Sequence, residues 1–264
     1  MPNDRITGSR LSGAGFKREH LAEQERAEVL ARFGGEGLVT DVVGTIGDGK
    51  EATVYLCRAD PSTGVEYLAA KVYRAQKFRA FSGSRSYARE RGHRDARSAR
   101  AIQAKTRKGR SLAHHEWIAW EWETLCRVHD AGADVPSPLA CSDDALLMEY
   151  VGTAERAAPQ LRHVDLDRAT AAALLERLLR TVEIFLACDL VHADLSAYNV
   201  LLDGDRPFVI DVPQAIDARS HPDAFAYLQR DVRNLERYFA RHGLSARRFA
   251  EEAWSRYRRG APAR

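Results

Sequence analysis

The sequence contains few residues that could crosslink it. Only four of its 264 residues are cysteines, namely Cys57, Cys126, Cys141 and Cys188. They are widely spaced and form no C-x-x-C pair, which argues against the common zinc-ribbon and redox motifs. We therefore expect four reduced thiols in a reducing compartment.

Long apolar runs are also missing. No stretch approaches the roughly 18 apolar residues that a membrane-spanning helix needs. The first residues, MPNDRITGSRLSGAGFKREH, lack the apolar core of a signal peptide. We therefore expect a cytoplasmic protein with no membrane partner. The composition, 45% hydrophobic and 29% charged, is ordinary for a globular chain that is long enough for one large domain or two lobes.

Lysine is scarce as well, since 34 of the 40 basic residues are arginines. The net charge of +3 says little about partners, but the charge is unevenly distributed. Between Arg74 and Arg110 there are thirteen basic residues and two acidic ones. The like charges in this segment repel one another, which predicts a flexible basic loop over residues 74–110. It would attract the phosphates of RNA or of a ribosomal particle, although a solvated surface loop has the same composition.

The first half of the chain is rich in strand-like stretches. A polar tail over residues 1–17 precedes a helix predicted over 18–33. Three short strands follow in LVTDVVGTI, ATVYLCRA and EYLAAKVYRA, joined by turns at GDGKE and DPSTGVE. Three successive strands of this length suggest an antiparallel meander.

The second half is mainly helical. An aromatic-rich helix over LAHHEWIAWEWETLCRVHDAG is followed by one apolar strand within DVPSPLACSDDALLMEYVG. A long amphipathic helix comes next, with Asp165 or Asp167 as its cap, and two further helices end the chain in 221–243 and 245–259. This order predicts an α+β fold.

Four polar residues stand inside two strand-like runs, in VHADLSAYNVLL and PFVID. They are His192, Asp194, Asn199 and Asp211. Phosphoryl transfer from ATP needs a carboxylate that orients the attacking group and oxygen ligands that hold metal ions. Asp194 could be that carboxylate, and Asn199 and Asp211 offer hard oxygen ligands for Mg²⁺. The spacing matches the H-R-D-x-x-x-x-N and D-F-G motifs of kinases, although Val and Pro replace Phe and Gly here. The alternative is a set of turn residues around a hairpin.

A glycine-rich turn, GTIGDGKEATVY, lies between the first two predicted strands. Glycines such as Gly47 and Gly49 let backbone N–H groups approach phosphates closely. It is not a Walker-type loop, because Glu51 follows Lys50 and a strand follows the turn. Any hairpin can carry glycines, so this signal is weak by itself.

Lys71 stands in the apolar stretch LAAKVY of the third predicted strand. It matches the lysine by which kinases hold the α- and β-phosphates. Such a lysine needs a carboxylate partner on a helix, and Glu121 is our choice, with Glu123 and Glu116 as alternatives. An edge lysine with its amine in water is the other interpretation.

These motifs resemble those of the RIO family of atypical protein kinases. GKEATVY is similar to the family's phosphate loop, AAKVY to its lysine strand and LLMEYVG to its hinge. HADLSAYNVLL and VIDVPQAID, with HPDAFAYLQRDVRN after them, are similar to its catalytic and metal segments. The resemblance covers about Val39 to Gly243 and is nearer to the first RIO subfamily, in a compact bacterial or archaeal form.

The resemblance implies a two-lobed protein-kinase-like α+β fold, with an antiparallel sheet in the N-lobe and a mainly helical C-lobe, and without an activation loop or A-P-E region. It divides the chain into a tail and helix (1–37), an N-lobe (38–150) that carries the basic loop, and a C-lobe (151–264). Pro213 departs from the family pattern, because many members have Ser there.

The resemblance also assigns roles to residues. Asp194, Asp211 and Lys71 would be catalytic, and Asn199 and Asp211 would bind Mg²⁺ or Mn²⁺. ATP would contact Lys71, Gly47, Gly49, Lys50, Glu51, Val54, Glu121, Met148, Glu149, Val151 and Asn199. Asp211, which we expect to be desolvated at the end of its strand, could itself accept the phosphate as an aspartyl-phosphate.

The leading hypothesis is therefore an ATP-dependent phosphotransferase of the RIO type, acting as a Ser/Thr protein kinase, by autophosphorylation or as an ATPase switch. The alternatives are a small-molecule kinase of the aminoglycoside or choline type, and a nucleotide-sensing scaffold on RNA or the ribosome. The sequence does not identify the protein substrate.

Overall fold

The computed structural model describes residues 23–74 and 107–260. The predicted tail (1–17), the start of the helix predicted over 18–33, and nearly all of the predicted basic loop lie outside the described residues. In the described part of the chain, no helix is both long and apolar enough to cross a membrane.

The first lobe is built on a five-stranded antiparallel sheet with the order β1-β2-β3-β5-β4. Its strands are β1 (Val39–Asp48), β2 (Ala52–Ala59), β3 (Tyr67–Tyr73), β4 (Pro138–Cys141) and β5 (Ala145–Glu149). The three-strand meander is as predicted. Between β2 and β3, Asp60 accepts a hydrogen bond from the Ser62 N–H and begins the short helix η1 (Pro61–Thr63), which ends at Gly64 with a φ of 75°. Glycine adopts this left-handed conformation without steric cost, so the turn forms where the sequence predicts it.

The sequence predicted one strand after the aromatic-rich helix, but the structure has two. The turn after Cys141 lets β4 fold back on β5, with Pro138 opposite Met148. β4 is a short edge strand, the position at which a sheet tolerates proline. The prediction failed because a four-residue strand that begins with proline has almost no periodic pattern.

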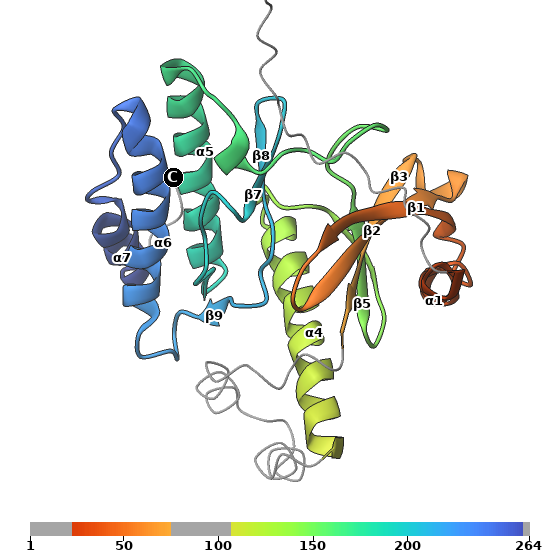
Figure 1. Ribbon diagram of the computed structural model, residues 1–264. Coiled ribbons are helices and arrows are strands. Elements are labelled where there is room, and N and C mark those ends of the chain that lie inside the picture. Colours follow the sequence, from red (N-terminus) through yellow and green to blue (C-terminus); the bar gives the residue numbers. More distant parts are fainter. Residues whose placement is uncertain (1–22, 75–106, 261–264) are drawn as a thin grey trace, which may run out of the picture.

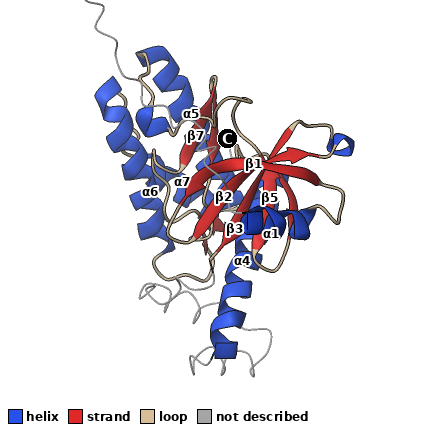
Figure 2. Ribbon diagram, turned by 45° about the vertical axis from the view of Figure 1, so that its right-hand side comes forward, coloured by secondary structure: helices blue, strands red, loops and turns tan. Residues whose placement is uncertain are grey.

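Helix α1 (Glu23–Phe33) lies against this sheet, as Figure 2 shows. Val29 and Phe33 bury one side of the helix in the core formed with β1, β2 and β3. Arg32 fastens it further, since its Nε and Nη2 lie 2.6 Å and 2.5 Å from the two carboxylate oxygens of Asp144.

Helix α4 (Arg107–Asp130) joins the two lobes. It begins five residues before the expected start at Leu112, so the last four residues of the predicted basic loop are helical. Ile118 packs against the sheet of the first lobe, whereas Leu125 and Val128 belong to the core of the second lobe. Trp120 Nε1 also donates to the Ala215 carbonyl at 2.9 Å. Helix α4 is therefore packed against both lobes, so its side chains have fixed positions relative to each of them.

The second lobe is mainly helical. Figure 1 shows its three long helices gathered on the side of the molecule away from the sheet of the first lobe. They are α5 (Arg168–Ala187), α6 (Ala224–Phe239) and α7 (Phe249–Arg258). Asp167 is the cap of α5, one of the two predicted candidates, and accepts from the Thr170 N–H at 2.9 Å.

Two small antiparallel pairs lie between these helices and the first lobe. The two strand-like runs of the sequence form a hairpin of β7 (Val200–Asp203) with β8 (Arg206–Val209), and β6 (Leu190–Val191) pairs with β9 (Ile216–Asp217). The remaining short helices are η3 (Leu161–His163) and η4 (Ala240–His242). From Asp211 the chain reaches α6 through the twelve residues 212–223, which contain only β9. The α+β organisation in two lobes is confirmed, while the boundaries at residues 37 and 150 stay predictions.

Candidate functional site

A cavity of about 840 Å³ lies where the two lobes meet. This volume is within the range of small-molecule and cofactor sites. Every residue that the sequence predicts for the site lines it: Gly47, Gly49, Lys50, Glu51, Val54, Lys71, Glu121, Met148, Glu149, Val151, Asp194, Asn199 and Asp211. The structure therefore brings together residues that are up to 164 positions apart in the chain, from Gly47 to Asp211.

Lys71 lines this cavity and connects the two lobes. Its Nζ lies 2.6 Å from Glu121 Oε1 and 2.9 Å from Asp211 Oδ1. The partner on α4 is thus Glu121, our first choice, whereas Glu116 and Glu123 are exposed. Lys71 is not an edge lysine in water, because its side chain is only 13% exposed.

Burial and pairing act together on these three groups. Burial would lower the pKa of Lys71, but the Asp211 and Glu121 carboxylates raise it above its usual range. Burial raises the pKa of Glu121, against the attraction of Lys71. Lys71 in turn lowers the pKa of Asp211. A buried lysine that keeps its charge in this way can attract an anionic ligand.

Asp211 differs from our expectation in one respect. We expected a desolvated carboxylate at the end of a strand, but β8 ends at Val209 and the Asp211 side chain is 44% exposed. Its backbone has a φ of 66°, a left-handed conformation that is uncommon for a residue with a side chain. The chain turns after β8, and this turn leaves the carboxylate open to the cavity.

Asn199 connects with Asp194 in the loop that precedes β7. Its Nδ2 donates to the Asp194 carbonyl at 2.9 Å and lies 3.4 Å from Asp194 Oδ2. The amide oxygen of Asn199 is not used in these bonds. The loop therefore places a carboxylate at the cavity surface, with an amide oxygen nearby.

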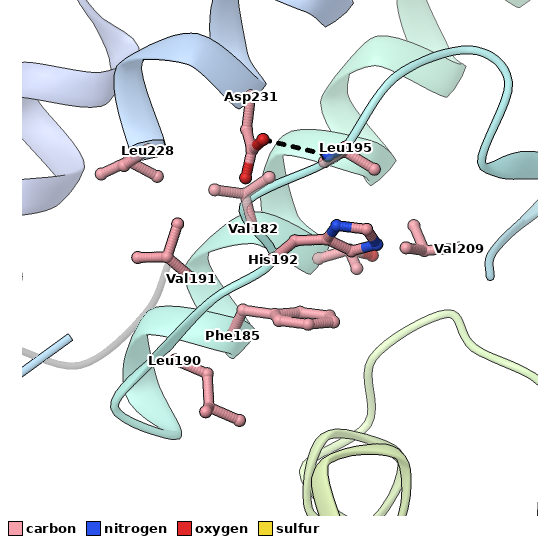
Figure 3. Close-up of a pocket in the computed structure, with 10 residues that line it drawn as sticks. Val182, Phe185, Leu190, Val191, His192, Leu195, Val209, Leu228 and Asp231 are labelled. Atoms are coloured by element: carbon pink, nitrogen blue, oxygen red, sulfur yellow. Dashed lines mark hydrogen bonds between the residues drawn. The ribbon is translucent and has the colours of Figure 1, made fainter. Parts of the chain in front are cut away.

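His192 fixes the positions of both functional segments. Its Nδ1 accepts from the Asp194 N–H at 3.2 Å, so the ring proton is on Nε2, which lies 3.4 Å from the Ile210 carbonyl. Burial lowers the pKa of His192, which keeps the ring neutral. As Figure 3 shows, the ring lies close to Phe185, and the two ring centres are 5.7 Å apart. The neutral His192 ring thus lies between the Asp194 loop and the Asp211 segment and bonds the backbone of both.

One side of helix α6 holds the backbone of the Asp194 loop. Asp231 accepts from the Ala193 N–H at 2.7 Å and from the Leu195 N–H at 3.0 Å, the second of which is the dashed line in Figure 3. Arg230 donates to the Ala193 carbonyl, and Asn234 donates to the Leu195 carbonyl at 3.0 Å. Ala193 has a φ of 63°. These four bonds hold a conformation that an alanine would not keep without support.

Asp231 itself is almost fully buried, at 1% exposed. Burial raises its pKa to about 7, against the two backbone N–H bonds. A buried carboxylate of this kind is costly unless it is hydrogen-bonded. Its bonds to the loop satisfy that need, so the fold of the loop and the burial of Asp231 depend on each other.

The glycine-rich turn between β1 and β2 forms the roof of the cavity. Gly49 N–H donates to the Ala52 carbonyl at 2.9 Å, and Arg74 Nη1 donates to the Gly49 carbonyl at 3.1 Å. Added Cβ atoms would approach protein atoms no closer than 3.8 Å at Gly47 and 3.4 Å at Gly49. The fold itself tolerates side chains at both positions, so the room they leave is available to a ligand. In the same turn, burial raises the pKa of Glu51, and the carboxylate of Asp211 adds to the shift.

The segment that joins the lobes after β5 offers backbone groups to the cavity. The Glu149 N–H donates to the Ser137 carbonyl at 2.8 Å, and the Val151 carbonyl accepts from Ala158 at 2.9 Å. The Val151 N–H has no hydrogen bond within the described residues. The Val151 N–H can therefore donate a hydrogen bond to the edge of a planar heterocycle that lies against Met148.

The oxygen donors fit magnesium better than zinc. Among residues 23–74 and 107–260, no three His, Cys, Asp or Glu side chains are grouped to hold a metal ion. Asn199 and Asp211 offer one amide oxygen and one carboxylate. Mg²⁺ typically takes one or two protein ligands and completes its shell with water and phosphate oxygens.

Sequence reasoning missed the residues that support the site. They are Tyr73, Arg74, Arg230, Asp231 and Asn234, which contact functional residues or the loops that carry them. The stretch HPDAFAYLQRDVRN, which the resemblance singled out without assigning roles, contains three of them. The available signal was Asp231 on the apolar face of its helix, three residues after Leu228 and four before Leu235, because a carboxylate there needs donors.

Comparison with known proteins agrees with the motifs. A family model for the RIO domain matches residues 53–252. The chain belongs to the RIO family. It is 29% identical over 238 residues to the serine/threonine-protein kinase RIO1 of Caenorhabditis elegans, covering 88% of this chain and 44% of the relative. It is 34% identical over 128 residues to the RIO-type serine/threonine-protein kinase Rio1 of Thermoplasma acidophilum, covering 48% of this chain and 66% of the relative.

Solved RIO structures have the same fold. The Rio2 kinase of Chaetomium thermophilum in an ADP/Mg²⁺-phosphoaspartate complex matches with a TM-score of 0.60 and 21% identity, over 84% of this chain and 63% of that one. The two-lobed, kinase-like α+β fold is thereby confirmed. The chain spans less than half the length of the RIO1 kinases of Caenorhabditis elegans and Homo sapiens that it matches, at 44% and 38%.

Proposed function

We propose that this chain is an ATP-dependent phosphotransferase of the RIO type that phosphorylates serine or threonine hydroxyls, its own or those of a protein substrate. The observation that carries the proposal is the convergence in one cavity of the Lys71–Glu121 ion pair with Asp194, Asn199 and Asp211. A charge clamp, an orienting carboxylate and two metal ligands are the parts that phosphoryl transfer requires.

Each part has a role in this proposal. Lys71 holds the α- and β-phosphates, and Glu121 fixes Lys71. The glycine-rich turn with Lys50 and Glu51 covers the phosphates. The adenine lies beside Val54 and Met148, with the Glu149–Val151 backbone at its edge. Asn199 and Asp211 hold Mg²⁺, which supplies positive charge against the charge that develops on the transferring phosphoryl group; Mn²⁺ would serve the same ligands.

Asp194 acts on the acceptor. Its carboxylate accepts a hydrogen bond from the attacking hydroxyl and orients the oxygen toward the γ-phosphorus. The bond from that oxygen to phosphorus forms as the bond to the β-phosphate oxygen breaks, the hydroxyl proton passes to the Asp194 carboxylate, and ADP leaves. The exposed position of Asp194, with Asn199 holding its backbone, suits a group that must contact a second substrate.

Asp211 can also act as the acceptor. The Rio2 kinase structure compared above is an ADP/Mg²⁺-phosphoaspartate complex, and the Asp211 carboxylate of this chain is open to the cavity. In that step an Asp211 oxygen bonds to the γ-phosphorus, ADP leaves, and water later cleaves the acyl-phosphate. The chain would then turn over ATP slowly as a switch.

Membership of the RIO family favours this proposal over a small-molecule kinase of the aminoglycoside or choline type. An RNA or ribosomal partner stays a prediction, because the basic segment that suggested it lies almost entirely outside the described residues.

The test is to incubate the protein with γ-labelled ATP and Mg²⁺ and to follow the label. Labelled protein, or free phosphate released at a rate that depends on Mg²⁺, supports the proposal. Turnover that persists unchanged in excess EDTA would contradict the metal assignment. Transfer only to a small metabolite would identify the alternative class of kinase.

A further inference from the structure

Tyr73 is the last residue of β3, two positions after Lys71. Side chains alternate along a strand, so both residues lie on the same face of β3. The Tyr73 hydroxyl donates to Glu121 Oε2 at 2.5 Å, while Lys71 Nζ bonds Oε1 at 2.6 Å. Both oxygens of one carboxylate are thus bonded by two side chains of a single strand.

The ring of Tyr73 is held independently of its hydroxyl. Its edge meets Trp117, with ring centres 5.1 Å apart and planes at 87°. The Lys71 Nζ lies 5.4 Å from the ring centre. The ring also belongs to a core cluster with Ala52, Ile118 and Leu146. The hydroxyl is therefore a donor in a fixed place, set by the packing of the first lobe.

We infer that Tyr73 is a positioning residue that fixes Glu121 and, through it, Lys71. Glu121 and Tyr73 are 3% and 4% exposed, so water does not readily replace either partner. Without the hydroxyl, a carboxylate held only at Oε1 could rotate, and its other oxygen would be buried without a donor. Tyr73 does not line the cavity and so would not contact a nucleotide. Any effect of its hydroxyl on nucleotide binding must therefore pass through Glu121, the group to which that hydroxyl donates.

This inference rests on the proposed function, because its consequence is nucleotide binding. A second explanation is that the hydroxyl merely satisfies a buried polar group and adds stability. The two explanations differ in whether the effect of Tyr73 on nucleotide affinity is coupled to Glu121. A positioning role makes the effect of Tyr73 on nucleotide affinity depend on the presence of Glu121, and a stability role does not.

The experiment is a double-mutant cycle with Tyr73→Phe and Glu121→Ala, measured as Mg²⁺·ADP affinity by calorimetry on the full chain. Tyr73→Phe keeps the ring contacts and removes only the hydroxyl. We expect it to weaken binding by about tenfold in the wild-type background. In the Glu121→Ala background it should have no further effect. If Glu121→Ala does not fold, Glu121→Gln replaces it, and the effect of Tyr73→Phe should then shrink.

Tyr257→Phe is the matched control. Its hydroxyl donates to another carboxylate, Asp189 Oδ1, at 2.9 Å in the second lobe and away from the cavity. It should leave nucleotide affinity unchanged. Thermal unfolding without nucleotide gives a second readout. Tyr73→Phe should lower Tm in the wild type, but should raise or maintain Tm beside Glu121→Ala, where the phenol has lost its acceptor.

The outcomes separate the inference from the proposed function. If the wild type does not bind Mg²⁺·ADP, the proposed function is overturned, together with any nucleotide role of Tyr73. If the wild type binds and Tyr73→Phe binds equally well, only the inference is overturned. The same holds if the loss in Tyr73→Phe is undiminished in the Glu121→Ala background.

Discussion

Two residues of the cavity hold backbone conformations that side chains usually prevent. Ala193 and Asp211 have φ angles of 63° and 66°, and each is next to a functional position or occupies one. Such conformations cost about 1–3 kcal/mol each and persist only where surrounding contacts determine them. For Ala193 those contacts come from α6. For Asp211 they include the Ile210 N–H bond to the Asn199 carbonyl at 2.9 Å. Backbone geometry, and not only side-chain chemistry, therefore sets the positions of Asp194 and Asp211.

Asp194→Asn should separate binding from turnover. The substitution keeps the shape of the side chain but removes the carboxylate that accepts the proton of the attacking hydroxyl. We expect label transfer from γ-labelled ATP to fall by about 10²–10⁴-fold. The affinity for Mg²⁺·ADP, measured by calorimetry, should stay near that of the wild type.

Asp205→Asn in the turn between β7 and β8 is the control for this change, because it neutralises an exposed carboxylate outside the cavity. It should leave both quantities unaltered. Wild-type turnover in Asp194→Asn would remove Asp194 from the mechanism and leave Asp211 as the acting carboxylate.

At the scale of residues, the sequence predicted the parts of the site that lie in short contiguous motifs. Asp194, Asn199 and Asp211 are within 18 positions of one another. Glu121 was harder to choose among three candidates, yet Ile118, Glu121 and Leu125 have the 3–4 spacing of one helix face, and all three are buried. The supporting contacts of Arg230, Asp231 and Asn234 could not be predicted, because they depend on how α6 packs against a loop some 40 residues earlier.

At the scale of elements, periodicity predicted the long helices and the meander well. It failed for short pieces, such as β4, β6 and β9, which are four or two residues long. Strands of this length form because neighbouring strands offer partners, and a sequence does not display that in its own pattern. The early start of α4 was missed as well, because the basic composition of residues 107–110 indicated a loop and gave no sign of a helix.

Helix α1 provides a prediction about stability. The Arg32 guanidinium lowers the pKa of Asp144 by its hydrogen bonds. Asp144→Asn should therefore reduce the free energy of unfolding at pH 7 by about 1 kcal/mol or less, as for a partly exposed ion pair. In the unfolded chain Asp144 titrates near pH ~3.9. Because its folded pKa is lower, this stability is present above about pH 4 and is lost as the pH falls through the folded pKa. Urea unfolding at pH 7 and below pH 4 measures the difference.

The neighbouring Asp143→Asn is the control, since Asp143 is exposed and Arg32 pairs with the carboxylate of Asp144 instead. It should change stability little at either pH. A loss in Asp144→Asn that is equally large below pH 4 would mean that the amide disturbs packing and that the ion pair contributes nothing measurable.

At the scale of the whole molecule, the motifs implied two lobes with a hinge in LLMEYVG, but not the other connections between the lobes. The structure adds α4, which contributes side chains to both cores, and Lys71, which bonds one residue in each lobe. The Lys71–Glu121 pair was expected from the kinase motifs. The Lys71–Asp211 bond and the packing of α4 in both cores were not, because each joins segments that are far apart in the chain.

The chemical fate of the phosphate tests the molecule as a whole. If Asp211 accepts the phosphate, protein labelled from γ-labelled ATP should lose label in neutral hydroxylamine, which cleaves acyl-phosphates but not phosphoserine or phosphothreonine. The exposed carboxylate beside Lys71 is the reason to expect it. Electrophoresis of treated and untreated samples gives the measurement, with a phosphoserine protein as the control.

Complete survival of the label would limit Asp211 to holding metal. Autophosphorylation would then be on a hydroxyl, and mass spectrometry of the labelled peptides would locate it.

The cavity has a consequence for the order in which its ligands arrive. Among the described residues that line it, three are cationic, namely Lys50, Lys71 and Arg230. Six are acidic, namely Asp48, Glu51, Glu121, Glu149, Asp194 and Asp211. The formal balance is negative, so a polyphosphate that came alone would meet repulsion before it reached Lys71. A nucleotide should therefore enter with its divalent cation already attached, and ATP in excess over the cation should compete poorly for the same space.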